Sequence, residues 1–217
     1  MLNARDAEAR GATILTRCPV TVATRTDTLW EIETPKGTFR AKALVNAGGP
    51  WVADILTGVM RQNTQHAIRL VRGSHIVTKK LYDHDKAYFF QGTDGRIIFA
   101  IPYEQDFTLI GTTDAEHEDA NTKPTISDAE RDYLCDFASE YFKTPVTPDD
   151  VVWTYSGVRP LYDDGASSAT AATRDYVLAL DDNGPPVLSV FGGKITTYRK
   201  LAEQALAKMQ LGQPWTA

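Results

Sequence analysis

The sequence predicts a mixed fold, α+β or α/β, with a β-rich middle. Apolar residues recur with a period of two in several runs between residues 68 and 112, as in half-buried strands. Two segments, 127–142 and 197–209, place apolar residues at helical spacing instead. The 217 residues are 42% hydrophobic and 24% charged, as in an ordinary globular protein. This composition excludes a disordered chain, a collagen-like rod and a small disulfide scaffold.

The first 60 residues predict short strands and a hairpin. Trp30 and Ile32 alternate with glutamates, and a Pro-Lys-Gly break separates this run from the next, which predicts a β-hairpin. The expected elements are, in order, a short helix ending at Arg10 before Gly11, strands over 13–15 and 19–24, the hairpin of 28–34 with 38–45, and a helix over 51–60.

The middle of the chain predicts an antiparallel meander with one packed helix. Ser127 and Glu130 have the spacing of a capping box ahead of an apolar stripe, which predicts a helix over 127–143. An antiparallel sheet commonly buries one face and leaves the other to solvent or ligand. The expected strands lie over 68–78, 87–91, 96–103, 107–112 and 151–155; a loop over 163–173, a strand pair 176–180 with 187–191 and a helix over 197–209 complete the chain.

Charge and cysteine content exclude several classes of protein. Lys and Arg total 23 and Asp and Glu total 28, and a net charge of −5 argues against a nucleic-acid binder. Cys18 and Cys135 are too few for a disulfide framework, and the four histidines lack ligand-like spacing, so no metal site is expected. No apolar run is long enough to span a membrane, which predicts a soluble, intracellular chain with at most peripheral membrane contact.

The first candidate site is the segment that begins Phe191-Gly192-Gly193-Lys194. A predicted strand ends there in two glycines and passes directly into a helix. Glycines allow close approach of the backbone to a ligand, and a helix N-terminus carries partial positive charge, to which Lys194 adds a full one. Such a corner suits a phosphate or the pyrimidine edge of a reduced flavin. The alternative is a tight turn with an exposed lysine.

Two further candidates are an arginine and a histidine on predicted strands. Pro160 holds Arg159 in extended backbone, where its guanidinium can bind a carboxylate or phosphate; the alternative is a salt-bridged arginine at a sheet edge. Arg174 either adds a second guanidinium or pairs with Asp175. Strand alternation places His75 on the face of Gly73 and Val71, opposite Arg72, Ser74 and Ile76. His75 can accept a hydroxyl proton or serve as a structural residue. The turn 111–114 faces a ligand or is an ordinary loop.

Six motifs occur in order along nearly the whole chain: 45–52 (VNAGGPWV), 69–77 (RLVRGSHIV), 110–114 (IGTTD), 152–161 (VWTYSGVRPL), 173–176 (TRDY) and 188–203 (LSVFGGKITTYRKLAE). Together they resemble the FAD-dependent, quinone-linked glycerol-3-phosphate dehydrogenases. Members of that family begin with a Rossmann G-x-G-x-x-G motif and end with a helical domain, and neither is found in this sequence. The resemblance therefore implies a central fragment that is inactive alone.

The resemblance also implies a division of the chain and roles for its residues. Segments 1–64 and 161–217 would belong to an FAD-binding domain of the amino-acid oxidase type, and 65–160 would form the antiparallel substrate domain. Lys194, Arg159 and His75 would be catalytic, and Arg159, Lys194 and Arg174 would bind the substrate. The residues implied in FAD binding are Gly48, Gly49, Pro50, Trp51, Gly192, Gly193, Lys194, Thr196 and Thr197.

The implied reaction is oxidation of glycerol 3-phosphate to dihydroxyacetone phosphate by hydride transfer to FAD, while a base takes the hydroxyl proton. Electrons would pass to a quinone, with the complete enzyme peripherally bound at the cytoplasmic side of the inner membrane. A homodimer is a further expectation. Two alternatives stay open: another amino-acid oxidase-like flavoenzyme with a different substrate, and a non-enzymatic module that binds small anions through Arg159 and Lys194.

Overall fold

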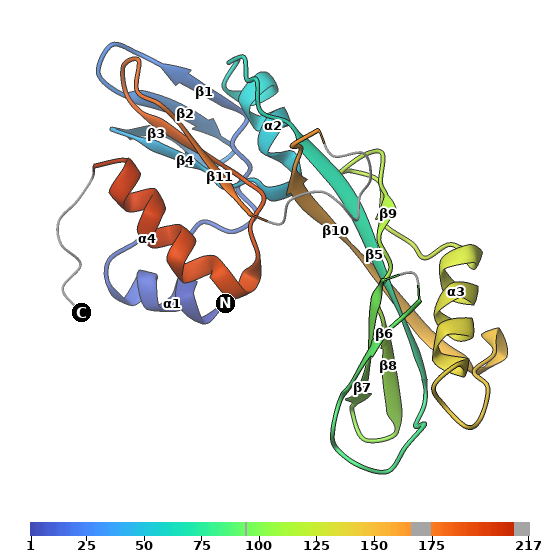
Figure 1. Cartoon of the computed structure of the whole chain (residues 1–217). Helices are drawn as coiled ribbons and strands as arrows, with labels where there is room; N and C mark the ends of the chain where they lie inside the picture. Colours follow the sequence, from blue (N-terminus) through green and yellow to red (C-terminus); the bar gives the residue numbers. More distant parts are fainter. Residues whose placement is uncertain (94, 166–174, 211–217) are drawn as a thin grey trace.

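Two long paired strands join the two parts of the molecule (Figure 1). The computed structural model describes residues 1–93, 95–165 and 175–210. Strands β5 (Ile68–Lys79) and β10 (Val151–Tyr162) pair antiparallel along nearly their full length. The upper part in Figure 1 holds two small sheets with helices α1 (Leu2–Ala9), α2 (Val52–Asp54) and α4 (Tyr198–Lys208); the lower part holds the rest of a six-stranded sheet and helix α3 (Asp128–Ser139).

The first small sheet confirms the predicted hairpin. Strands β1 (Val22–Arg25), β2 (Trp30–Thr34) and β3 (Gly37–Ala41) follow one another antiparallel. The strand expected over 13–15 is wrong, because Ile14 and Leu15 are exposed and pair with no strand of the described chain. The run expected over 38–45 is broken after Ala41, so that its last residues leave the hairpin for another sheet.

The second small sheet brings two distant segments together. Strand β4 (Leu44–Asn46) runs parallel to β12 (Val187–Phe191), which pairs antiparallel with β11 (Val177–Asp181) as predicted. Because β4 and β12 are parallel, their carboxyl ends lie at one edge of the sheet. Ala205 of α4 and Met209, which follows the helix, pack against Leu188 of this sheet.

The segments that follow β4 and β12 are less regular than expected. Instead of one helix over 51–60, the chain forms a 3-10 turn (Gly49–Trp51), the short α2, and a π-helical turn (Ile55–Val59). Residues 195–197 likewise form a 3-10 turn (Ile195–Thr197) before α4 begins. Pro50 lies in the first turn of this segment, where the missing N–H of proline costs no intrahelical hydrogen bond.

The six-stranded sheet has the order β10-β5-β8-β7-β6, with β9 (Ala115–Glu116) as an extra partner of β5. The other strands are β6 (Tyr88–Gln91), β7 (Ile97–Tyr103) and β8 (Phe107–Gly111). Strand β10 was predicted to end at 155, yet it continues through Tyr162. It is the edge strand of the sheet, and an edge strand tolerates Pro160 because one side of its backbone needs no ladder partner.

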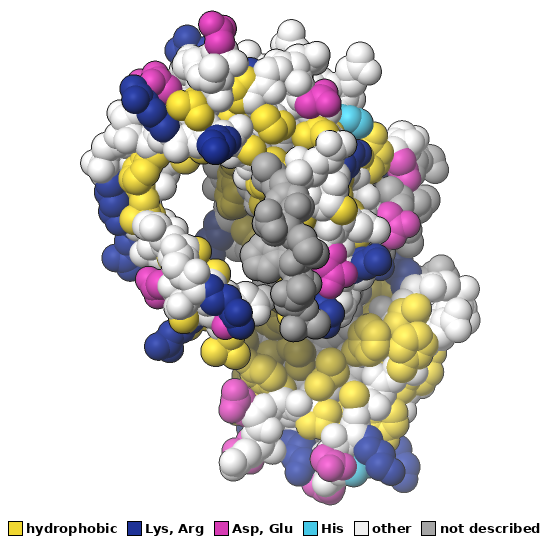
Figure 2. Space-filling model, turned by 90° about the vertical axis from the view of Figure 1, so that its left-hand side faces the viewer, with side chains coloured by type: hydrophobic (Ala, Val, Ile, Leu, Met, Phe, Trp, Pro, Cys, Tyr) yellow, Lys and Arg dark blue, Asp and Glu magenta, His cyan; other side chains and the backbone are white. Residues whose placement is uncertain are grey.

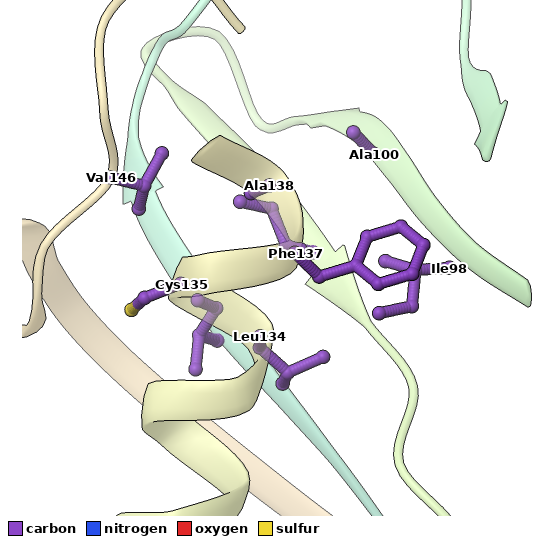
Figure 3. Packing of buried hydrophobic residues seen from close by; sticks show 9 residues of the cluster. Ile98, Ala100, Leu134, Cys135, Phe137, Ala138 and Val146 are labelled. Atoms are coloured by element: carbon purple, nitrogen blue, oxygen red, sulfur yellow. The ribbon is translucent and has the colours of Figure 1, made fainter. Parts of the chain in front are cut away.

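Helix α3 covers one face of this sheet. Its capping box is confirmed: the Ser127 side chain accepts from the Glu130 N–H, and the Glu130 carboxylate accepts from the Ser127 N–H. Figure 3 shows Leu134, Phe137 and Ala138 of the helix packed toward Ile98 and Ala100. The helix ends at Ser139, four residues earlier than expected. The Ser139 hydroxyl donates to the Cys135 carbonyl and accepts from the Val146 N–H, which stabilises the turn away from the helix axis.

Candidate functional site

Arg159 lies near the upper end of β10 and is held by the turn that follows β8. Its Nη1 donates to Asp114 Oδ1 at 2.7 Å and to the Thr113 carbonyl at 3.2 Å, and its Nη2 donates to Thr112 Oγ1 at 2.9 Å. The structure therefore contains the salt-bridged arginine on an edge strand that the sequence left as an alternative. The same contacts fix the orientation of the guanidinium, which a recognition role also requires.

His75 lies beside Arg159 on the same face of the sheet. Its ring stacks on Tyr155 with 4.7 Å between ring centroids, and its Nδ1 is buried with no hydrogen-bond partner in the described chain. Burial, with a contribution from the Arg159 charge, lowers the pKa of His75 from 6.5 to about 4. The ring is therefore neutral at pH 7, and a neutral imidazole can accept a proton.

Two glycines leave the space that these side chains occupy. A Cβ added to Gly73 would overlap the Arg159 guanidinium, and one added to Gly111 would overlap the His75 ring. Gly111 pairs with His75 in the sheet register, so the ring lies across the neighbouring strand. The predicted alternation is confirmed, because Arg72, Ser74 and Ile76 contact α3 or the core beneath it on the opposite face.

The two turns predicted to bind cofactor leave the same edge of the β4–β12 pair. Residues 47–51 follow β4, and residues 192–197 follow β12. Buried Asn46 fixes the first turn: its amide donates to the Val52 carbonyl, and its oxygen accepts from the Gly48 N–H. Gly192 and Gly193 both have positive φ, which only glycine adopts without strain.

Both turns also lie near the part of β10 that carries Arg159. The turn Gly49–Trp51 contacts β10, and Gly192 lies beside the Tyr162 N–H at the end of β10. Lys194, Thr196 and Thr197 are exposed, and the Thr197 hydroxyl donates to the Lys194 carbonyl. Within the described chain, no side-chain partner of Lys194 is found. Arg174, the other predicted substrate ligand, lies outside the described residues.

An apolar groove of about 610 Å³ runs along β4 and the first turn. Gly48, Trp51 and Ile55 line it, whereas His75, Arg159 and Lys194 do not. Its apolar lining fits a ring system or packed protein better than a phosphate. The structure thus brings His75 close to Arg159 and both turns close to β10, and the groove adjoins the first turn but not His75 or Arg159.

The contacts that support the site residues were not predicted from the sequence. The turn 111–114 was a candidate, but its support of Arg159 and the space that Gly73 leaves for the guanidinium follow only from the strand pairing. Asn46 carried a usable signal, because an asparagine ahead of Gly-Gly-Pro is typical of a side chain that bonds its own turn.

A family model described as FAD dependent oxidoreductase matches residues 1–199. The chain belongs to this family. It is 45% identical to a glycerol-3-phosphate dehydrogenase of Pseudomonas aeruginosa over 100% of this chain and 45% of that protein. It is 44% identical to a D-erythritol 1-phosphate dehydrogenase of Brucella abortus over 99% of this chain and 45% of that protein.

A solved structure also matches this chain. The glycerol-3-phosphate dehydrogenase of Bacillus halodurans, complexed with FAD, superposes with a TM-score of 0.76 at 30% identity, covering 98% of this chain and 42% of that one. These matches confirm the family resemblance, the fold class and FAD as the cofactor of the family. The chain spans about 45% of the length of its curated relatives. Among the described residues, no helix has the length and apolar character needed to cross a membrane.

Proposed function

We propose that this chain carries the substrate-contacting part of an FAD-dependent dehydrogenase that oxidises glycerol 3-phosphate. The observation that carries the proposal is a neutral histidine with an unpartnered Nδ1 beside a fixed arginine on one open sheet face. The similarity to proteins named glycerol-3-phosphate dehydrogenase supports the choice of substrate. D-erythritol 1-phosphate is the second substrate to test, because a relative named for it is 44% identical.

The proposed roles follow from the surroundings of each side chain. His75 accepts the hydroxyl proton, since its Nδ1 has no partner in the described chain; the lowered pKa keeps the ring neutral at pH 7 and also makes it a weaker base. Arg159 supplies oriented N–H donors rather than net charge, because Asp114 already balances its charge. Exposed Lys194 supplies the net positive charge that an anionic substrate or product requires.

The two turns fit the cofactor of the family. Positive φ at Gly49, Gly192 and Gly193 lets backbone approach a ligand without a side chain in between, and the turn 195–197 begins a helix whose first N–H groups favour an anion. When bound, FAD supplies the acceptor for the two electrons and the hydrogen removed from the substrate carbon. We infer that tight binding and activity need the remaining length that the relatives have.

The first experiment titrates FAD into the purified chain and follows flavin fluorescence. If FAD binds, anaerobic addition of glycerol 3-phosphate or D-erythritol 1-phosphate tests for bleaching of the flavin absorbance. If it does not bind, the same assay is run on protein extended to the length of the relatives. A flavin bleached only by amines or amino acids would overturn the substrate assignment. Saturable glycerol 3-phosphate binding with no flavin reduction in either protein would support the anion-binding module instead.

A substitution tests the role of Lys194. We expect Lys194→Ala to lower kcat/KM by about a hundredfold to a thousandfold, because one lost contact to developing charge costs about 2.7–4 kcal/mol. Lys200→Ala is the matched control, as an exposed lysine on the helix that follows. Equal activity of Lys194→Ala and the unmodified enzyme would remove Lys194 from the mechanism.

We further propose an apolar electron acceptor, a quinone, for the complete enzyme, together with peripheral attachment to the inner membrane. The open face of the six-stranded sheet supports an apolar partner. Figure 2 shows hydrophobic side chains gathered over the lower part of the molecule. The exposed ones that this sheet contributes outside the α3-covered face are Phe89, Ile97, Phe99, Ile101, Val152, Trp153 and Tyr155. Turnover with a short-chain quinone but not with oxygen, and co-sedimentation with vesicles, are the expected results.

Analytical ultracentrifugation tests the expected homodimer.

A further inference from the structure

Glu130 is a buried carboxylate on the face of the sheet opposite Arg159. It lies in the first turn of α3 and is 8% exposed. Its Oε2 accepts from Arg72 Nη2 at 2.6 Å and from the N–H and hydroxyl of Ser127 at 3.0 and 2.9 Å. Its Oε1 accepts from Thr113 Oγ1 at 2.7 Å and from Ser74 Oγ at 3.0 Å. One carboxylate therefore joins the helix, the long strand β5 and the turn after β8.

Thr113 carries this connection to the other face of the sheet. Its hydroxyl donates to Glu130 and accepts from the Ser74 N–H at 3.0 Å, and its own N–H donates to the Ser74 carbonyl. Its carbonyl accepts from Arg159 Nη1, and its two neighbours, Thr112 and Asp114, hold the rest of the guanidinium. These three hydrogen bonds of the Arg159 guanidinium thus go to a three-residue turn whose centre is bonded to Glu130.

We propose that Glu130 is a positioning residue for Arg159, acting through Thr113. The inference rests on the proposed function only in assuming that Arg159 contacts substrate. The connection from Glu130 to Arg159 rests on the hydrogen bonds described above. A carboxylate is needed because all five groups that contact it are donors. A glutamine would present an amide N–H₂ to some of those donors, and a buried donor facing a donor leaves both unsatisfied.

A simpler account is that Glu130 only caps α3. The two accounts differ at Thr113, whose hydroxyl takes no part in the capping box. Thr113→Val removes the hydroxyl that bonds both Glu130 and the Ser74 N–H and keeps the shape and the cap, whereas Thr113→Ser keeps the hydroxyl. Glu130→Gln removes the charge, and Glu140→Gln makes the same change at an exposed position just past the same helix.

The test measures hydrogen exchange of the amides of residues 112–114, the NMR signal of Arg159 Nε–H, and the dissociation constant for glycerol 3-phosphate. Thermal unfolding establishes that each variant is folded. We expect Thr113→Val and Glu130→Gln to speed exchange at 112–114, to broaden the Arg159 signal and to raise the dissociation constant about tenfold. Thr113→Ser and Glu140→Gln should match the unmodified protein in all three.

Folded Thr113→Val with unchanged exchange and an unchanged Arg159 signal would overturn the inference and leave Glu130 as a helix cap. If Glu130→Gln fails to fold, the Thr113 pair decides alone. If the unmodified protein binds no glycerol 3-phosphate even when extended to the length of its relatives, the proposed function fails. The exchange and NMR measurements then still decide whether Glu130 positions Arg159.

Discussion

The two faces of the six-stranded sheet differ in how their buried polar groups are hydrogen-bonded. On the face covered by α3, Glu130 accepts from four residues, and Ser74 is bonded to both Glu130 and Ser156. On the open face, the Nδ1 of His75 is buried with no partner in the described chain, and aromatic side chains are left exposed. The Arg159 guanidinium on the open face is itself bonded to the turn 112–114, so in the described chain the Nδ1 of His75 is the buried polar atom of this face that lacks a partner.

Strand β5 contributes side chains to both faces of the sheet. Along β5, Arg72, Ser74 and Ile76 point to the helix, while Gly73 and His75 point to the open side. Since side chains alternate strictly, a shift in register by one residue would exchange the two sets. The many bonds to Glu130 therefore fix the register on one face, and this register places His75 and Arg159 on the other.

The largest expected contrast is in packing. Leu134 of α3 is fully buried, so Leu134→Ala should lower the free energy of unfolding by about 2–5 kcal/mol, through lost burial and a residual cavity. Phe99 on the open face is 40% exposed, so Phe99→Ala should cost less than about 2 kcal/mol despite removing a larger side chain. Urea unfolding of both variants measures the difference. Equal losses would mean that the open face is as well packed as the covered one.

The next contrast concerns pH on the covered face. Burial raises the pKa of Glu130, but bonds from Arg72, Ser127 and Thr113 outweigh it and lower the pKa from 4.5 to about 2. Because the folded-state pKa is depressed, this stabilisation is complete above about pH 4.5 and is lost as pH falls toward 2. The shift corresponds to roughly 3 kcal/mol. The stability gap between the unmodified protein and Glu130→Gln, measured by urea unfolding, should therefore shrink from pH 7 to pH 3. A constant gap would contradict the assigned pKa.

The open face should respond to pH in a different window. His75 has a pKa of about 4 when folded and 6.5 ordinarily, so between these values the unfolded chain binds a proton that the folded chain does not. Stability should fall as pH is lowered from 6.5 to 4, by less than for Glu130 because the ring is only half-buried. His75→Gln should flatten this slope in thermal unfolding. Parallel slopes for the variant and the unmodified protein would remove His75 as the cause.

Local patterns predicted the parts of the molecule that depend on neighbouring residues. The hairpin around Pro35, the capping box of Ser127 and Glu130, and the alternation around His75 all follow from spacing within a few residues. The roles of the site residues stay predictions, because contacts alone do not report chemistry.

Predictions failed where a distant partner decides the structure. Strand β10 continues past 155 because it pairs with β5 over that length. The run expected over 38–45 is broken at residues 42–43 because β4 pairs with β12 in another sheet. Residues 13–15 have a suitable composition but no partner strand in the described chain. The same limit hid the support of Arg159 by the turn at 112–114, since these residues are more than 40 positions away.

The smallest substitution gives the sharpest test of the open face. Gly73 and Gly157 are paired opposite each other on β5 and β10, yet a Cβ at Gly73 would overlap the Arg159 guanidinium, whereas a Cβ at Gly157 would meet no atom within 4 Å. Both have backbone conformations that alanine can adopt, and the overlapped group is the end of a flexible side chain. Gly73→Ala should therefore shift the melting temperature by less than about 3 °C.

The same Gly73→Ala change should displace the guanidinium from Asp114 and Thr112 and weaken glycerol 3-phosphate binding about tenfold, as expected for loss of about 1.4 kcal/mol. Gly157→Ala should leave both affinity and the Arg159 Nε–H signal unchanged. If Gly73→Ala moves the Arg159 signal without changing affinity, the arginine belongs to the architecture of the sheet rather than to the ligand. The contrast between the two faces would then depend on His75 alone.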